Sequence, residues 1–569
     1  MNRLALFMGC LLYLTSGLAG TAERSPIRVV IHDQVMNSVD DRLFGHFMER
    51  ASFGEPGYDA ARDLNNPRAL DPKVVELLSW LNIPLVRWPA GADLDKIDWR
   101  DSIDNVPGRD GPRPVFARNK HGIFTNEFGL DEFLALCEKQ GWKPLLPVRF
   151  RPVLFGQVTP AEGAREAASL VAYCNAKKGA AIPEGLDIWP EVRAKNGRSP
   201  PWKVPYFQIG NETWLYFGEA LKARGLSDKT DKEKAEWYLT CLRAYLAAIH
   251  QIDPESQIIV DGTTGAGRWV DQFVLNDPFV RQHVSFYALH MYQPWAIKEV
   301  RKNGEITSPD KLTCEDIWYC YVATPAINRE TFQSDIPSWP DWWLVRDLDL
   351  PLAVTEWNWN GWWRNGDRPP EFESELAKGL GAAGMLHAFM RNGDVIKIAC
   401  QSMLVGKYWG ITGVRVSEDK SPRLLPTAMV TGLYSRHHGR ERLFVEIANT
   451  PTYVQSCRIN SIAPAPRVAF LVIVATRNDN ALYLHVINRH RDENMPLEIV
   501  ASRIGPLDGI ATFYVLSGPI VSSDTTGYAE IREKTIKRDG DSVFWEIPAR
   551  SVCVVEMPFK KRLGTAPHK

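Results

Sequence analysis

The strongest constraint on the fold is a repeated alternation of helical patterns with short apolar runs. Amphipathic stretches at 74–81, 128–139 and 232–252 are each followed by an apolar run, such as 85–88 after the first. Continuous apolar runs are typical of parallel strands that are covered on both faces. About eight such units over residues 45–430 predict the α/β class and a closed (β/α)8 barrel, the TIM barrel. A doubly wound open sheet is the alternative.

The pattern changes near residue 431. From there to residue 560, short alternating runs such as 481–487 and 552–557 are separated by turn residues, and helical periodicity is absent. This arrangement predicts a C-terminal antiparallel β-sandwich. Residues 23–44 contain one isolated apolar run, which we expect to form a strand that pairs with this β-sandwich.

The first 22 residues have the layout of a secretory signal peptide. A basic Met1-Asn2-Arg3 precedes an apolar stretch over 4–18, and small residues follow up to Ala22. The stretch is too short for a membrane-spanning helix. We therefore expect cleavage near residue 22, a secreted or periplasmic mature protein without membrane association, and a solvated tail at 561–569.

Cysteine usage allows one local disulfide. Cys314 and Cys320 lie close together in a stretch that resembles a loop, so they could pair in an exported protein. The remaining cysteines of the mature chain are scattered singly, and we expect them to be buried as small apolar side chains.

Composition and motifs narrow the class of ligand. The formal net charge of −1 argues against a nucleic-acid partner, because phosphate recognition needs a basic surplus. No C-x-x-C or H-E-x-x-H motif is present, so neither a metal site nor a cofactor is predicted. The chain contains 20 tryptophans, whose flat faces suit stacking on a sugar ring. We expect an oligo- or polysaccharide substrate, and the sequence leaves homo-oligomerisation open.

Two glutamates follow apolar runs where a barrel enzyme keeps its active site, at the carboxyl ends of the strands. Glu212 comes just after the run 206–209, and Glu356 ends the run 352–356. A pair of carboxyl groups that flanks a sugar bond is the minimal machinery of glycoside hydrolysis. One carboxyl group must donate a proton and the other must be ionised. A lone strand-end glutamate can simply cap the next helix, but the joint pattern favours catalysis.

Five motifs, in order along the chain, carry a family resemblance. They are Phe44-Gly45-His46-Phe47-Met48-Glu49, Gly210-Asn211-Glu212, Leu289-His290-Met291-Tyr292, Thr355-Glu356-Trp357-Asn358 and Ser551-Val552-Cys553-Val554-Val555-Glu556-Met557. With these motifs the chain resembles glycoside hydrolase clan A, and most of all the family 51 α-L-arabinofuranosidases. The resemblance spans about residues 28–558.

The resemblance implies a role for each matching residue. Glu212 is the acid/base, Glu356 is the nucleophile, and the reaction retains anomeric configuration. Glu49 and Asn211 contact the sugar, and Tyr292 hydrogen-bonds the nucleophile. Further expected substrate contacts come from Arg87, His290 and four candidate stacking residues, Trp88, Trp214, Trp295 and Trp357. A buried His290 could instead be a satisfied core histidine.

Two segments depart from the family pattern. Ala92 stands where the family has a sugar-binding Asn, and Met403-Leu404-Val405-Gly406 stands where it has Gln-Leu-Val-Asn, with Gln401 displaced. The leading hypothesis is an exported retaining α-L-arabinofuranosidase that releases terminal furanosyl residues from plant or microbial polysaccharide. The alternatives are another clan A enzyme (galactofuranosidase, β-xylosidase or endo-glucanase) or a carbohydrate-binding protein without catalysis.

Overall fold

The computed structural model describes residues 25–52, 55–119, 122–262, 268–294, 297, 299–322, 350–359, 373–417, 421–459, 462–502 and 504–560. Within these residues eight parallel strands form a closed barrel, which confirms the prediction and excludes the open sheet. The barrel closes because the last strand pairs with the first. In chain order its strands are β2 (Gly45–Phe47), β5 (Leu85–Arg87), β8 (Lys143–Val148), β9 (Tyr206–Ile209), β10 (Gln257–Asp261), β11 (Phe286–Gln293), β14 (Leu352–Trp359) and β15 (Ile396–Ser402).

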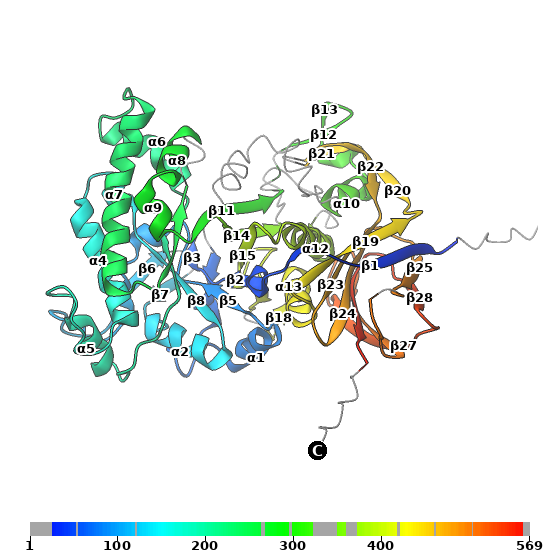
Figure 1. The fold of residues 1–569 in the computed structure, drawn as a ribbon, viewed down its shortest axis with the longest axis horizontal. Coiled ribbons are helices and arrows are strands. Elements are labelled where there is room, and N and C mark those ends of the chain that lie inside the picture. Colours follow the sequence, from blue (N-terminus) through cyan, green and yellow to red (C-terminus); the bar gives the residue numbers. More distant parts are fainter. Residues whose placement is uncertain are drawn as a thin grey trace, which may run out of the picture.

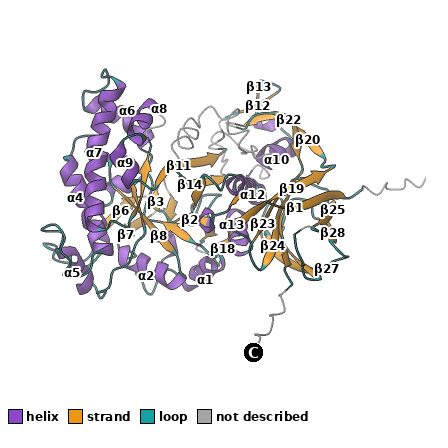
Figure 2. Cartoon of the chain, in the orientation of Figure 1, coloured by secondary structure: helices purple, strands orange, loops and turns teal. Residues whose placement is uncertain are grey.

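Helices surround the barrel, and Figure 2 shows most of them on the half of the molecule opposite the C-terminal sheet, whereas the last three described α-helices in chain order lie beside that sheet. The long pair α4 and α7 begin at Thr159 and Thr230, each of which forms a capping box with a glutamate three residues on. None of the described helices is long and apolar enough to cross a membrane. The α-helices are α1 (Pro72–Trp80), α2 (Leu130–Gln140), α3 (Arg151–Leu154), α4 (Pro160–Asn175), α5 (Ile188–Lys195), α6 (Thr213–Ala223), α7 (Asp231–Ile252), α8 (Arg268–Leu275), α9 (Pro278–His283), α10 (Cys314–Val322), α12 (Glu375–Arg391) and α13 (Pro426–Arg436).

Side chains alternate along each barrel strand between the interior and the helical layer. Phe47, Leu85, Tyr206 and Ile259 belong to the small apolar cluster that fills the interior. The residues between them on the strands pack outward in the large cluster that the helices cover. Strand alternation therefore decides which residue types can reach the centre of the barrel.

The C-terminal part is a mostly antiparallel sheet. Its nine described strands run in the order β27-β26-β29-β24-β23-β19-β1-β25-β28 and enclose a second apolar core. The N-terminal strand β1 lies between β19, to which it is antiparallel, and β25, to which it is parallel. Figure 1 shows the blue β1 among these yellow-to-red strands. The bounds are β1 (Ile27–Ser38), β19 (Glu441–Ala448), β23 (Leu471–Arg477), β24 (Ala481–Asn488), β25 (Met495–Val500), β26 (Ile510–Ser517), β27 (Glu530–Lys537), β28 (Ser542–Ile547) and β29 (Ser551–Pro558).

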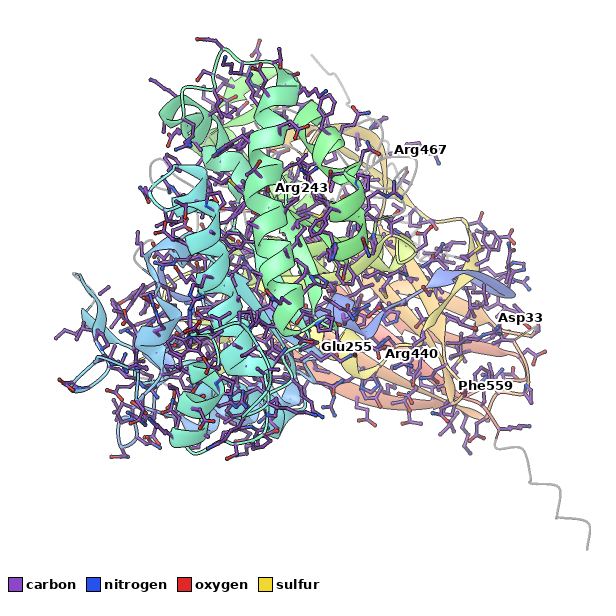
Figure 3. All side chains as sticks on the ribbon, turned by 60° about the vertical axis from the view of Figure 1, so that its left-hand side comes forward. Asp33, Arg243, Glu255, Arg440, Arg467 and Phe559 are labelled. Atoms are coloured by element: carbon purple, nitrogen blue, oxygen red, sulfur yellow. The ribbon has the colours of Figure 1, made fainter. Side chains whose placement is uncertain are left out.

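The barrel and the sheet domain lie side by side, as the turned view in Figure 3 also shows, with Asp33 and Phe559 labelled on the sheet side. Both parts also contain short additional strands. One of them, β12 in the loop after β11, pairs with β21 of the C-terminal part. The remaining elements are η1 (Asp41–Phe44), β3 (Arg50–Ser52), β4 (Glu55–Gly57), η2 (Tyr58–Ala61), η3 (Leu94–Lys96), η4 (Trp99–Ser102), β6 (Val115–Asn119), β7 (Gly122–Thr125), β12 (Val300–Lys302), β13 (Glu305–Thr307), η5 (Pro309–Lys311), β16 (Val405–Gly406), β17 (Val414–Arg415), β18 (Arg423–Leu424), β20 (Thr452–Gln455), β21 (Cys457–Ile459) and β22 (Ala465–Ala469).

The suggested pairing of Cys314 with Cys320 is wrong, because both residues lie on helix α10 rather than in a loop. Six residues along a helix rise about 9 Å and turn the two side chains to different faces. Both thiols are free, and the Cys320 thiol lies 3.6 Å from the carbonyl oxygen of Cys457. The singly placed cysteines of the described chain are buried, as expected.

Candidate active site

The two predicted catalytic glutamates meet at the carboxyl end of the barrel. Glu212 follows β9, the fourth barrel strand, and Glu356 lies within β14, the seventh. One carboxylate oxygen of each residue and a ring nitrogen of His290 all lie within 4.8 Å of one another. The side chain of Glu212 is 24% exposed and that of Glu356 is 9% exposed, so the pair is accessible mainly at Glu212.

Glu212 stands at the N-cap of α6 in the left-handed backbone region, with φ of 49° and ψ of 41°. A residue with a side chain adopts this conformation at a cost of about 1–2 kcal/mol, so its surroundings must hold it there. The local chain therefore turns abruptly from strand to helix at the residue that carries the carboxyl group.

A β-bulge in β14 aims Glu356 into the barrel. Along β11, Leu289 pairs with Val354, but the next residue, His290, pairs with Glu356, so Thr355 is the extra residue. A bulge shifts the side-chain alternation by one residue. Both Thr355 and Glu356 consequently reach His290, Thr355 through its hydroxyl at 3.1 Å from Nε2.

Charged and polar groups hold Glu356 in its ionised form. Arg87 Nη1 donates to Oε1 at 2.6 Å, and the Tyr292 hydroxyl donates to Oε2 at 2.8 Å. Burial acts to raise the pKa of Glu356, but His290, Arg87 and Tyr292 together outweigh it, and the pKa is lowered. Arg87 also donates through Nη2 to Asn211 Oδ1 at 2.6 Å, which ties the residue before Glu212 to the same guanidinium.

His290 joins the two glutamates and is not a core histidine satisfied elsewhere. Its Nδ1 lies 3.0 Å from Glu212 Oε1 and 3.5 Å from Glu356 Oε2. Burial alone would lower the pKa of His290, but the charge of Glu356 and the hydrogen bond to Glu212 raise it overall. The ring therefore favours the charged form between two carboxyl groups.

Glu49 is a third buried carboxyl group beside Glu356. A Cβ at Gly91 would lie 2.6 Å from Glu356 Oε1 and 3.3 Å from Glu49 Oε1, so this glycine fits between the two side chains. Burial, and then the charge of Glu356, raise the pKa of Glu49 well above its usual value. The pKa values of Glu49 and Glu356 are thus shifted in opposite directions.

The structure separates the predicted aromatic contacts. Trp214 meets the His290 ring edge-on, with centroids 5.0 Å apart, and belongs to the site. Trp88 stacks on Phe133 of α2, and Trp357 packs edge-on against Phe389 of α12, so both lie in the helical layer and the prediction that they stack on substrate is wrong. The reason is strand alternation: each follows an inward residue, Arg87 or Glu356, and must point outward. Trp295 lies outside the described residues.

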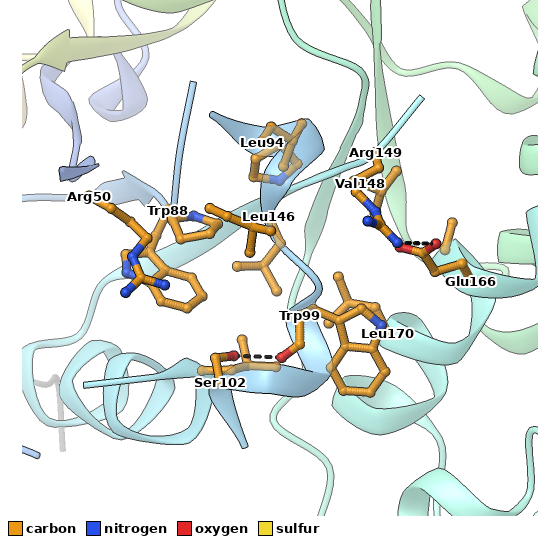
Figure 4. A pocket seen from close by; sticks show the side chains of 15 residues that line it. Arg50, Trp88, Leu94, Trp99, Ser102, Leu146, Val148, Arg149, Glu166 and Leu170 are labelled. Atoms are coloured by element: carbon orange, nitrogen blue, oxygen red, sulfur yellow. Dashed lines mark hydrogen bonds and ion pairs between the residues drawn. The ribbon is translucent and has the colours of Figure 1, made fainter. Parts of the chain in front are cut away.

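A small cavity of about 30 Å³ lies beside Trp88, outside the barrel wall. Its lining includes Trp99, Leu146 and Leu170, and the ion pair between Arg149 and Glu166 stands at one end, as Figure 4 shows. Neither Glu212 nor Glu356 lines this cavity. It is a gap between strands and helices, separate from the catalytic carboxyl groups.

Gln208 and Asp261, which the sequence did not predict as site residues, are both buried in the barrel beside the site. Gln208 Oε1 accepts from Arg87 Nε at 3.1 Å, and Gln208 Nε2 donates to Asp261 Oδ1 at 3.1 Å. Asp261 ends an apolar run just as Glu356 does, so the strand-end rule could have found it. The displaced Gln401 bonds instead to Thr431 and to the backbone of Thr427, away from the carboxyl pair.

Glu212, His290 and Glu356 also have the residue types of a metal site. Arg87 and Tyr292, however, already bind the two oxygens of Glu356 at 2.6 and 2.8 Å. A guanidinium that close to a ligand repels a cation, so the arrangement suits a neutral substrate such as a sugar better.

Comparisons with known proteins place the chain in a family. Residues 77–296 match the model of the Alpha-L-arabinofuranosidase 1 domain, and residues 356–551 match that of the Alpha-L-arabinofuranosidase C-terminal domain. A "Probable alpha-L-arabinofuranosidase C" of Aspergillus niger is 24% identical, over 87% of this chain and 90% of its own. An "Intracellular exo-alpha-L-arabinofuranosidase" of Bacteroides ovatus is 22% identical, over 96% of this chain and 98% of its own.

A solved structure shares the whole architecture. The GH51 α-L-arabinofuranosidase from Thermotoga petrophila superposes with a TM-score of 0.64 at 22% identity, covering 93% of this chain and 99% of that one. The two family models together cover most of the barrel and of the C-terminal sheet, and Glu212 and Glu356 each lie within one of them. The chain therefore belongs to the α-L-arabinofuranosidase-like glycoside hydrolases of family 51.

Proposed function

We propose that the protein is a retaining α-L-arabinofuranosidase that releases terminal furanosyl residues from plant or microbial polysaccharide. The observation that carries this proposal is the separation of the catalytic oxygens, which lie within 4.8 Å of each other. Retaining glycosidases hold their two carboxyl groups ~5–5.5 Å apart, whereas inverting enzymes leave ~6.5–9.5 Å for a water molecule. The names of the relatives support the choice of sugar.

The reaction has two steps. In the first, the Glu356 carboxylate attacks the anomeric carbon while the bond to the leaving oxygen breaks, and Glu212 gives its proton to that oxygen. In the second, Glu212 takes a proton from water, the water oxygen attacks the anomeric carbon, and the ester bond to Glu356 breaks. Both glutamates then return to their starting protonation states.

Neighbouring residues support each step. Arg87 and Tyr292 keep Glu356 ionised and aimed. Because Asn211 Oδ1 accepts from Arg87, its amide nitrogen faces away from the guanidinium and can donate to the sugar 2-hydroxyl. Glu49 is placed to bind a ring hydroxyl next to Glu356.

Azide rescue tests the assignment. Glu356→Ala should abolish turnover, and azide should restore it with a glycosyl azide of inverted configuration. Glu212→Ala should slow substrates with poor leaving groups most, and azide should give the retained product. Glu219→Ala, on the exposed face of α6, is the control and should behave like wild type. Near-normal activity of Glu356→Ala, or inverted product from the wild-type enzyme, contradicts the mechanism.

A panel of chromogenic glycosides tests the sugar. We expect the highest kcat/KM on 4-nitrophenyl α-L-arabinofuranoside. A clear preference for a β-xyloside, a galactofuranoside or a glucan would show instead that the pocket has been rebuilt for another substrate.

Export is a second part of the proposal, supported by the basic and apolar layout of residues 1–22. Sequencing the N-terminus of the protein from a periplasmic or culture fraction should show cleavage near residue 22. An uncleaved chain confined to the cytosol would contradict it.

A further inference from the structure

Asp261 lies at the end of β10, between the strand that leads to Glu212 and the strand that carries His290. It is 2% exposed, and no hydrogen bond links it to either catalytic glutamate. Instead, each carboxylate oxygen of Asp261 contacts a group that helps to hold one of the two glutamates.

Oδ2 of Asp261 holds the peptide that follows Glu212. The backbone N–H of Thr213 donates to this oxygen at 2.9 Å, and the Thr213 hydroxyl lies 3.3 Å from it. That N–H belongs to the peptide unit whose orientation ψ of Glu212 sets, in the left-handed conformation described above. The bond therefore fixes the backbone turn that presents the proton donor.

Oδ1 of Asp261 sets the direction of the Gln208 amide. Gln208 Nε2 donates to this oxygen at 3.1 Å, and its Oε1 accepts from Arg87 Nε at 3.1 Å. An ionised carboxylate can only accept and a guanidinium can only donate, so the amide between them has one satisfied orientation. Arg87 then reaches Glu356 Oε1 at 2.6 Å.

We propose that Asp261 is a positioning residue that fixes the proton donor and the nucleophile together, through Thr213 on one side and through Gln208 and Arg87 on the other. The proposal rests on the roles proposed above for Glu212 and Glu356. Asp261 performs this task only as a carboxylate, because a protonated oxygen would present a donor to Gln208 or Thr213, which already donate.

The charged groups that face Asp261 make this state sensitive to pH. Burial raises its pKa to about 6; His290, the Thr213 amide and Arg87 act to lower it, and Glu212 acts to raise it. Activity that needs the carboxylate is therefore lost as the pH falls through this range. Glu356 has a lowered pKa and stays ionised further into acid.

The main experiment compares Asp261→Asn with Asp131→Asn. Asp131 on α2 is a control carboxyl group whose pKa burial also raises to about 6, and it binds Tyr173 away from the site. Asp261→Asn should lower kcat by about 10²-fold, the scale of a displacement of roughly 1 Å, with a larger loss for poor leaving groups than for 4-nitrophenol. Its remaining activity should persist to lower pH than that of wild type. Asp131→Asn should keep both the rate and the pH profile.

The variant Gln208→Met tests the link to Arg87 separately from the link to Thr213. It also provides a test of the proposal if Asp261→Asn does not fold. It removes the link to Arg87 but leaves the contact to Thr213, so both kinds of leaving group should slow equally. Where both variants fold, the double variant should lose less than the product of the two single losses. The proposal is overturned if Asp261→Asn has the kcat of the wild type and the acid limb of its pH–rate profile. If that variant does not fold, a wild-type kcat in Gln208→Met overturns the proposal. Failed azide rescue of the Glu212 and Glu356 variants would instead overturn the proposed function.

Discussion

Glu49 and Glu356 are neighbouring buried carboxyl groups whose pKa values the structure shifts in opposite directions. His290 and Arg87 lower the pKa of Glu356, whereas burial and the negative charge of Glu356 raise the pKa of Glu49 more than the Gly91 N–H and Arg87 lower it. Two adjacent carboxylates in a closed site repel each other, so the proton favours Glu49 over Glu356, to which Arg87 donates directly. One residue then acts as a base or nucleophile and the other as a neutral hydrogen-bonding group.

Replacing Glu49 by Gln should therefore be mild. An amide resembles a protonated carboxyl group in shape and lacks charge, so Glu49→Gln should keep most of kcat/KM. Glu49→Ala should lose more, because it removes the hydrogen-bonding group. In the wild type, activity should fall as the pH rises through the raised pKa of Glu49. Glu49→Gln should lose that alkaline limb in a pH–rate profile, and an unchanged limb would show that another group titrates there.

Gly91→Ala should damage the site without damaging the fold. The added Cβ would lie 2.6 Å from Glu356 Oε1, which Arg87 and Tyr292 prevent from moving away. We expect kcat/KM to fall by about 10²-fold while the melting temperature changes little. Gly218→Ala on α6 is the matched control, because an added Cβ there meets no atom within 4 Å. Equal activity of the two variants would show that Glu356 has freedom to shift.

Site residues could be predicted from the sequence where the residue type is rare at its position. The prediction failed where the direction of the side chain decides whether it reaches the site. Charged groups at the ends of apolar strands had few structural alternatives, so Glu212 and Glu356 were identified correctly as neighbours. Trp88 and Trp357 are next to site residues in sequence, but strand alternation turns them outward. Asp261 ends an apolar run as Glu356 does, so its place was predictable, but its positioning role depends on its contacts with Gln208 and Thr213, which no local pattern records.

At the level of elements, the carboxylate of Glu55 binds the loop at 407–409, after the last barrel strand, β15. Glu55 of β4 accepts the backbone N–H groups of Lys407, Tyr408 and Trp409 at 2.6, 2.7 and 2.8 Å. Glu55 is 1% exposed, so these bonds are shielded from water. This contact fixes the residues that directly follow the 403–406 segment, which departs from the family pattern.

Glu55→Gln should release that loop. The amide nitrogen would face at least one N–H donor, so we expect the free energy of unfolding to fall by about 1–3 kcal/mol. Hydrogen–deuterium exchange should rise at residues 407–409. Glu76→Gln, on the exposed face of α1, provides the control and should alter neither measurement. Unchanged exchange in Glu55→Gln would mean that other contacts hold the loop.

Elements were predictable where they are long and periodic. The helical pattern at 232–252 became α7 (Asp231–Ile252), and most barrel strands lie where apolar runs occur. The first barrel strand, β2, has three residues, too few for a periodic signal, and only the family motif pointed to it. The parallel pairing of β1 with β25 joins segments far apart in the chain, which no local pattern could show.

Over the whole molecule, the first and last described strands share one sheet, and side chains of that sheet join the large apolar cluster around the barrel in addition to forming their own core. The large cluster around the barrel includes Tyr483, Val552 and Val554 from the C-terminal sheet. The barrel and the sheet should therefore unfold in a single transition rather than one after the other.

Removing β1 tests this dependence. A chain that begins at residue 39 leaves the edges of β19 and β25 unpaired, so it should be aggregated and inactive although no site residue is missing. A chain that begins at residue 25 keeps the strand and should be soluble and active. Calorimetry and activity measurements compare the two, and a stable, active chain from residue 39 would show that the barrel folds independently.

The bulge at Thr355 means that the presence of Glu356 in the sequence does not guarantee an enzyme. If Thr355 paired with His290 in a regular ladder without the bulge, the strand would keep its glutamate but turn it from the lumen toward the surrounding helices. Such a chain would still contain the sequence motif around the glutamate, but it would be catalytically inactive. Among distant relatives, the register of this strand is thus a better guide to activity than the presence of the glutamate in the sequence.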